Sequence, residues 1–98
     1  MNAPITAIGL DAQPRLVAHY RLQWEEVQKA WVLLYPEGMV KLNGSAGEIL
    51  KRCDGAQSVA AIVADLEAAF ATQNLQGDVL AFMEMAAQQR WLAWGPSA

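Results

Sequence analysis

The sequence predicts a single α+β domain in which a three-stranded antiparallel meander is followed by three helices. Three observations predict this fold class. Residues 19–43 carry apolar side chains in strict alternation or in a continuous run of β-forming residues, which is typical of strands. From residue 45 onward, apolar residues recur at the three- and four-residue spacing of helices. The length of 98 residues allows one domain and no more.

The three strands are placed by their patterns and by the turns between them. Residues 19–24 alternate between apolar and polar side chains, which predicts a half-buried strand. A polar turn over 25–29 leads to a continuous apolar run at 31–35, the predicted central strand. The Pro-Glu-Gly segment at 36–38 predicts a type I turn whose glycine takes the left-handed conformation and closes a three-residue hairpin. Residues 39–43 then form the third strand, on an edge of the sheet.

The first helix is predicted from its start and stop signals. Ser45 and Glu48 form the S-x-x-E pattern of a capping box. Apolar residues at i, i+3, i+4 and i+7 extend the helix to Cys53. Gly55 follows in the place that glycine usually takes after a helix.

Two further helices complete the domain. Ser58 caps the second helix, whose apolar stripe runs over 59–70. A break at 72–77 separates it from the third helix, predicted over 78–90, and residues 91–94 form a short extended tail. Three strands followed by three helices, with a short Gly-containing turn between helices, make the arrangement winged-helix-like.

The ends of the chain are predicted to lie outside this domain. Residues 1–14 contain two prolines and a glycine without periodicity and are expected to form a flexible N-terminal arm. The folded domain covers 15–94, and 95–98 form a C-terminal tail. No basic stretch followed by an apolar one opens the sequence, and no uncharged apolar run reaches the length of a membrane span. We therefore expect a cytoplasmic protein with no membrane partner.

Charge excludes nucleic acid as a partner. The chain has 7 basic and 10 acidic residues, a net charge of −3. Winged-helix DNA-binding proteins carry basic side chains on the recognition helix, whereas residues 56–89 contain no Lys or Arg. Composition favours contact with protein instead, because 54% of the residues are hydrophobic and only 17% are charged. Part of that apolar surplus is alanine, which weakens the indication.

The sequence offers no catalytic, metal-binding or cofactor-binding motif. Cys53 is the only cysteine and His19 the only histidine, so neither a disulfide framework nor a zinc cluster is available. Cys53 lies on an apolar stripe and is predicted to be a buried residue; the alternative is a nucleophile–base pair with His19. That pair is disfavoured because His19 is expected on the outward face of the first strand. Residues 44–47 lack the Lys-Ser/Thr end of a phosphate-binding loop. The chain is therefore predicted not to be an enzyme and to hold no cofactor.

Two surfaces are suited to bind a peptide. The edge strand exposes unpaired backbone groups with only Lys41 to guard it, so a peptide could add there as a fourth strand. On the third helix, an apolar flank adjoins the core-facing stripe and includes the flexible side chain of Met83. Two alternatives stay open: the flank packs inside the domain, or the edge pairs with a second copy in a homodimer. The candidate peptide-binding residues are Met39, Val40, Lys41, Leu42, Asn43, Val79, Leu80, Met83 and Ala87.

Several strings of residues resemble the pyrroloquinoline quinone (PQQ) biosynthesis protein D family. They are WVLLYPEG at 31–38, LN at 42–43, EIL at 48–50 and CDG at 53–55, and the resemblance covers roughly residues 15–94. Members of this family are small, non-catalytic peptide chaperones, recognition elements for ribosomally made and modified peptides. The resemblance implies that the chain binds the precursor peptide of the PQQ pathway and presents it to a radical S-adenosylmethionine (SAM) enzyme.

The resemblance also implies where the peptide lies and which partner supplies the chemistry. In such recognition elements the precursor lies along the third strand and against the third helix, here 39–43 and 79–87. The iron–sulfur clusters would belong to the radical SAM enzyme. We hypothesise that Val40, Lys41 and Leu42 supply backbone pairing, and that Leu80 and Met83 form the pocket.

Overall fold

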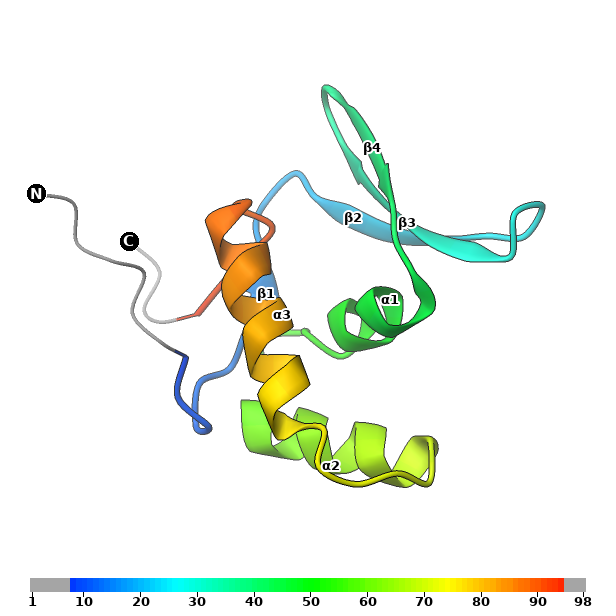
Figure 1. Cartoon of the computed structure of the whole chain (residues 1–98). Coiled ribbons are helices and arrows are strands. Elements are labelled where there is room, and N and C mark those ends of the chain that lie inside the picture. Colours follow the sequence, from blue (N-terminus) through cyan, green and yellow to red (C-terminus); the bar gives the residue numbers. More distant parts are fainter. Residues whose placement is uncertain (1–7, 95–98) are drawn as a thin grey trace, which may run out of the picture.

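The computed structural model describes residues 8–94, which form two small sheets and three helices (Figure 1). Among these residues, no helix is both long enough and apolar enough to cross a bilayer. The predicted tail at 95–98 and residues 1–7 of the predicted arm lie outside the described part. In chain order the elements are β1 (Arg15–Leu16), β2 (Arg21–Glu25), β3 (Ala30–Tyr35), β4 (Gly38–Lys41), α1 (Gly44–Lys51), α2 (Val59–Ala69), α3 (Gln76–Gln88) and β5 (Leu92–Ala93).

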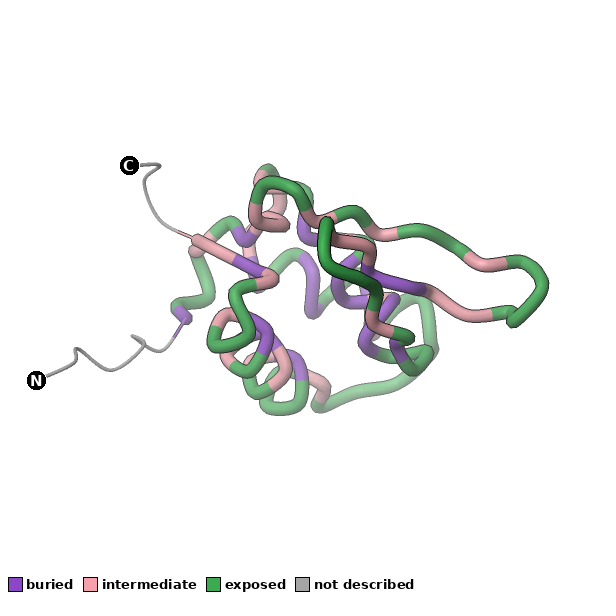
Figure 2. The backbone as a smooth tube through the Cα atoms, turned by 90° about the horizontal axis from the view of Figure 1, so that it is seen from above, coloured by how far each residue is buried: buried purple, intermediate pink, exposed green. Residues whose placement is uncertain are grey.

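The predicted three-stranded meander is confirmed, with β3 between β2 and β4 and both pairs antiparallel. Leu33 in β3 lies opposite Leu22 and Val40 in the neighbouring strands. Leu33 is fully buried, and the other two side chains pack against the same hydrophobic core. This face of the sheet is covered by the helices (Figure 1), whereas the far end of the β2–β3 hairpin projects away from the body with mostly exposed residues (Figure 2).

The turn between β3 and β4 is shorter than predicted. Tyr35 pairs directly with Gly38, which leaves a two-residue loop, Pro36 and Glu37. Gly38 is not left-handed, because Gly55, with a φ of 80°, is the only described glycine with positive φ. The prediction of a three-residue hairpin closed by a left-handed glycine was therefore wrong. Gly38 belongs to β4 itself, which begins one residue earlier than expected.

The cap of α1 also differs from the prediction. Asn43, not Ser45, is the N-cap: its Oδ1 accepts a hydrogen bond from the backbone N–H of Ala46 at 2.7 Å. The hydroxyl of Ser45 donates to the same oxygen at 3.2 Å. An asparagine side chain caps a helix as well as serine does, so the helix begins at Gly44, with only Leu42 and Asn43 between it and β4. The carboxylate of Glu48 is consequently not part of a capping box and is available for other contacts.

The second helix begins as predicted, and residues just before β1 pack against its first turn. Ser58 caps α2 by accepting a hydrogen bond from the N–H of Ala61 at 3.0 Å. The first N–H groups of a helix have no partner inside it. Here Val59 donates to Ala12 and Ala60 donates to Leu10, both at 2.9 Å. Residues 8–14, which the sequence assigns to the arm, are thus attached to the domain.

A second, two-stranded sheet was not predicted. Strands β1 and β5 pair antiparallel, Arg15 with Ala93 and Leu16 with Leu92. The N–H of Val17 extends the ladder by donating to the carbonyl of Trp91 at 2.9 Å. The predicted extended tail at 91–94 therefore contains a strand, and its partner comes from the other end of the domain.

Candidate functional site

The cysteine–histidine alternative does not fit the structure. Cys53 is buried, and its thiol donates to the carbonyl of Ile49 at 3.2 Å. Burial raises the pKa of this thiol to about 12, so the nucleophilic thiolate is scarce near neutral pH. His19 is exposed in the turn before β2. Among residues 8–94, no three His, Cys, Asp or Glu side chains are grouped so as to hold a metal ion.

The burial of Cys53 predicts slow alkylation. At pH 8, we expect maleimide to label the native protein at least ~100-fold more slowly than the urea-unfolded protein, because both the pKa and the burial of the thiol oppose attack. Quenched time points analysed by intact-mass spectrometry give the two rates. Equal rates in the native and unfolded protein would contradict the buried position of Cys53.

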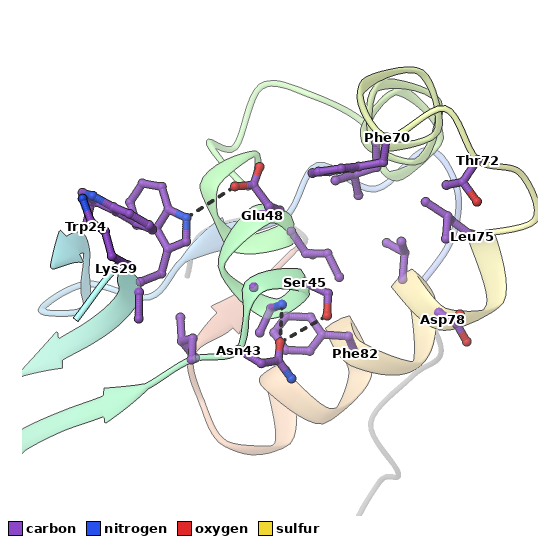
Figure 3. Close-up of a pocket in the computed structure, with 18 residues that line it drawn as sticks. Trp24, Lys29, Asn43, Ser45, Glu48, Phe70, Thr72, Leu75, Asp78 and Phe82 are labelled. Carbon is purple, nitrogen blue, oxygen red and sulfur yellow. Dashed lines mark hydrogen bonds between the residues drawn. The ribbon is translucent and has the colours of Figure 1, made fainter. Parts of the chain in front are cut away.

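A groove of about 720 Å³ lies beside the point where β4 ends. One wall consists of the Trp31 side chain and the first turns of α1. The other wall consists of the end of α2, with Phe70, and the first half of α3, with Asp78 and Phe82. Figure 3 shows Phe70, Asp78 and Phe82 around the groove, with Asn43 at the junction between the strand and α1. Aromatic side chains and few polar groups are the usual lining of a binding site.

The indole of Trp31 is held from four sides. It packs on the face of α1 at Gly47, where an added Cβ would lie only 2.2 Å from the Trp31 Cδ1 atom. The Trp24 ring meets it edge-on, with centroids 5.4 Å apart. The ammonium of Lys51 lies 5.9 Å from its centroid, and the indole N–H donates to Glu48 Oε2 at 3.4 Å. Only the remaining surface of the ring is available to a ligand in the groove.

Glu48 is in turn held by an arginine outside the groove. Arg52 Nη1 donates to Glu48 Oε1 at 2.8 Å and to the Glu48 carbonyl at 2.9 Å. The Nε of the same guanidinium donates to Asp65 on α2 at 2.5 Å. The hydrogen bond from Arg52 is the main reason why the pKa of Glu48 lies below its ordinary value. Glu48 is therefore ionised in the folded protein at neutral pH.

The outer edge of β4 presents a defined set of backbone groups. The N–H of Leu42 donates to the carbonyl of Trp31 at 2.9 Å, so this opposed pair is hydrogen-bonded. In an antiparallel ladder such pairs alternate. The backbone groups of Val40 and Leu42 therefore point toward β3, and those of Met39 and Lys41 point outward. Of Val40, Lys41 and Leu42, the three residues expected to supply backbone pairing, only Lys41 directs its backbone groups toward the free edge.

The structure brings together only part of the predicted helix surface. Val79 and Met83 are 2% and 0% exposed and belong to the hydrophobic core. Leu80 and Ala87 are half-buried and do not line the groove. Of the nine predicted residues, those that do line it are Leu42, Asn43 and Val79.

Sequence reasoning missed the aromatic residues of the groove. The helical spacing of Phe82 favours a position facing the core, yet it is only half-buried and lines the groove. Phe70 is 54% exposed at the end of α2. Trp31 belongs to a continuous apolar run in which no alternation shows which face is free. The position of an aromatic residue at the very end of a predicted helix, as at Phe70, is the one signal that the sequence offers.

Comparison with known proteins identifies relatives over most of the chain. Residues 30–92 match the family model described as Coenzyme PQQ synthesis protein D (PqqD). A PqqA binding protein of Pseudomonas aeruginosa is 54% identical over 85 residues, covering 86% of this chain and 92% of that protein. A PqqA binding protein of Klebsiella pneumoniae is 49% identical over 74 residues, covering 74% and 80%.

Two solved structures share the fold. The first is the solution structure of a PqqD truncation of Methylobacterium extorquens PqqCD, described as a functional, stand-alone recognition element for ribosomally synthesized and post-translationally modified peptides. It is 33% identical to this chain with a TM-score of 0.76, covering 92% of this chain and 97% of that one. The second, a crystal structure of PqqD from Xanthomonas campestris, is 36% identical with a TM-score of 0.51, covering 85% and 94%.

Proposed function

Because the chain belongs to the coenzyme PQQ synthesis protein D (PqqD) family, we propose that it binds the precursor peptide PqqA in PQQ biosynthesis without catalysing a step itself. The observation that carries this proposal is the continuity of two surfaces. The outward backbone groups of Met39 and Lys41 lead directly to Asn43, where the aromatic groove begins. A peptide added to β4 as a fourth strand would continue into that groove.

The two surfaces have complementary roles in this proposal. Backbone hydrogen bonds along β4 supply affinity for any extended chain and little selectivity. Selectivity comes from the groove, where the apolar faces of Trp31, Phe70 and Phe82 can receive side chains of the peptide. Leu42, Asn43 and Val79 line the same groove. Met83 lies in the core and Leu80 packs against it, and neither these two nor Ala87 lines the groove, so in this proposal they make no direct contact with the peptide.

In this proposal the contribution to biosynthesis is positioning. Adding the peptide as a strand converts a flexible chain into an ordered one and fixes which residues extend beyond the complex. A ternary complex with a radical SAM enzyme then raises the effective concentration of the peptide at that enzyme's active site. Iron–sulfur clusters would reside in the enzyme, and the complex would form in the cytoplasm.

Substitution of Lys41 by proline tests the edge. Lys41→Pro removes an outward N–H without touching a bond to β3, so we expect PqqA binding to weaken about tenfold while the domain stays folded. The measurement is an amide NMR titration of the labelled protein with the PqqA peptide. Lys41→Ala is the matched control and should bind as the wild type does, because it keeps the backbone donor.

Val40→Pro provides the opposite control, since the N–H of Val40 points toward β3 and its loss should destabilise the sheet itself. Wild-type affinity in Lys41→Pro would contradict strand addition at this edge. Absence of any saturable shift in the wild-type protein would contradict peptide binding altogether.

The same edge also supports the homodimer that the sequence leaves open. Met39 is 56% exposed beside the unpaired backbone, a surface on which a second β4 could pair. Size-exclusion chromatography with light scattering, over a range of concentrations and with or without PqqA, distinguishes the two functions. A dimer that dissociates as peptide is added would show that both use the β4 edge.

A further inference from the structure

We propose that Arg52 is a positioning residue for peptide recognition: without lining the groove, it holds Glu48 and thereby fixes the indole of Trp31 in the groove wall. This inference rests on the proposed function, because it assumes that the groove is where the peptide binds. Arg52 itself belongs neither to the β4 edge nor to the lining of the groove.

The first step is the contact between Arg52 and Glu48. The two side chains are only 13% and 27% exposed, so their ion pair is partly shielded from water. The guanidinium also donates to the backbone carbonyl of Glu48, and this second bond restricts the direction from which it reaches the carboxylate. Glu48 Oε1 is thus committed to Arg52. Its Oε2 is left to accept the hydrogen bond from the Trp31 indole.

The second step runs from that oxygen to the ring. Oε2 of Glu48 lies 3.4 Å from Nε1 of Trp31, a long hydrogen bond that depends on where the carboxylate is held. The helix at Gly47 supports the ring at Cδ1 and Cγ, beside the indole nitrogen, and the Trp24 ring meets it in an edge-on geometry. A carboxylate free to rotate would leave the indole N–H without a fixed acceptor. The ring could then tilt into the groove, and the surface offered to a peptide would change.

The Arg52 guanidinium makes a second ion pair, and loss of the two pairs is expected to have different effects on Trp31. Nε of Arg52 bonds to Asp65, which joins the end of α1 to α2 and is 53% exposed. Exposed ion pairs contribute little to stability. If the ion pair with Glu48 orients Trp31, then loss of the Asp65 carboxylate should leave the Trp31 ring in place. This difference separates positioning from a general role in holding the helices together.

The experiment compares Arg52→Gln, Arg52→Lys and Asp65→Asn with the wild type. The indole N–H resonance of Trp31, assigned with Trp31→Phe, is recorded in the free ¹⁵N-labelled protein, and the affinity for PqqA is measured by titration. We expect Arg52→Gln to move that resonance and to weaken binding about tenfold. Lysine can still pair with a glutamate four residues earlier, so Arg52→Lys should restore part of both. Asp65→Asn should leave both close to wild type.

The readouts keep the positioning role apart from the function on which it rests. The Trp31 resonance in the free protein reports positioning with no peptide present. An unmoved resonance in folded Arg52→Gln, or equal losses in Arg52→Gln and Asp65→Asn, would overturn the proposal. If wild-type protein binds no PqqA, the proposed function fails whatever the resonance does. Thermal unfolding followed by circular dichroism establishes that each variant is folded, and if Arg52→Gln is not, Arg52→Lys decides the question by the same two readouts.

Discussion

Replacing Met83 by alanine is expected to lower the free energy of unfolding by about 2–5 kcal/mol. Met83 is 0% exposed and packs in the core beside Val79 and Ala86 of the same helix. Truncation removes buried apolar surface and leaves a cavity that the surrounding side chains fill only in part. Small domains have a total free energy of unfolding of about 5–15 kcal/mol, so this single change would remove a large part of it. Urea denaturation followed by circular dichroism measures it.

The same variant tests where the peptide contacts α3. Because Met83 lies in the core and not in the groove, Met83→Ala should retain PqqA affinity within a few fold when measured in the folded protein. Phe82→Ala is the matched comparison one residue away: Phe82 is half-buried and lines the groove, so its truncation should reduce affinity more and stability less. The reverse outcome, stable Met83→Ala that has lost the peptide, would restore Met83 to the binding site.

Gly47→Ala is expected to destabilise the domain although alanine favours helices. The new Cβ would lie 2.2 Å from Cδ1 and 2.7 Å from Cβ of Trp31, so the strand or the ring must move. Overpacking of this kind costs about 1–3 kcal/mol or more, and the better helix propensity of alanine offsets up to about 1 kcal/mol. We expect a net loss of about 2 kcal/mol in urea denaturation. PqqA affinity should also fall, because Trp31 forms one wall of the groove.

Gly44→Ala is the matched control for this prediction. Gly44 lies in the same helix, and nothing approaches within 4 Å of the position where its Cβ would be. Its substitution should change stability by no more than about 0.5 kcal/mol. If Gly47→Ala were as stable as Gly44→Ala, the close approach of Trp31 to α1 would not exist in solution.

Local patterns in the sequence predict most of the fold. Strict alternation places β2, and a continuous apolar run places β3 at the centre of the sheet. Ser58 caps α2 as expected because the cap depends on a side chain and a backbone N–H three residues apart. The pairing of β1 with β5, in contrast, has no local pattern in the sequence that predicts it. Each strand has two residues, too few for any periodicity, and their partners lie more than seventy positions apart.

The residues of the proposed binding surfaces are harder to predict, because they depend on how a helix is rotated about its axis and on how closely a strand and a helix approach each other. The apolar arc on α3 is so wide that the sequence cannot decide which part faces the core; Met83 turns inward and Phe82 toward the groove. The packing of Trp31 on Gly47 requires β3 and α1 to cross closely, and no local sequence pattern encodes this crossing. Likewise, Glu48 fits a capping box in the sequence and instead pairs with Arg52 in the structure.

The pairing of β1 with β5 makes the domain modular. Since these strands are antiparallel, Arg15 at the start of β1 lies opposite Ala93 at the end of β5. Neither strand contributes a residue to the groove. A protein fused after β5 would therefore be attached away from the proposed binding groove. Such a layout would leave the proposed binding groove accessible when the domain is joined to another protein at this sheet.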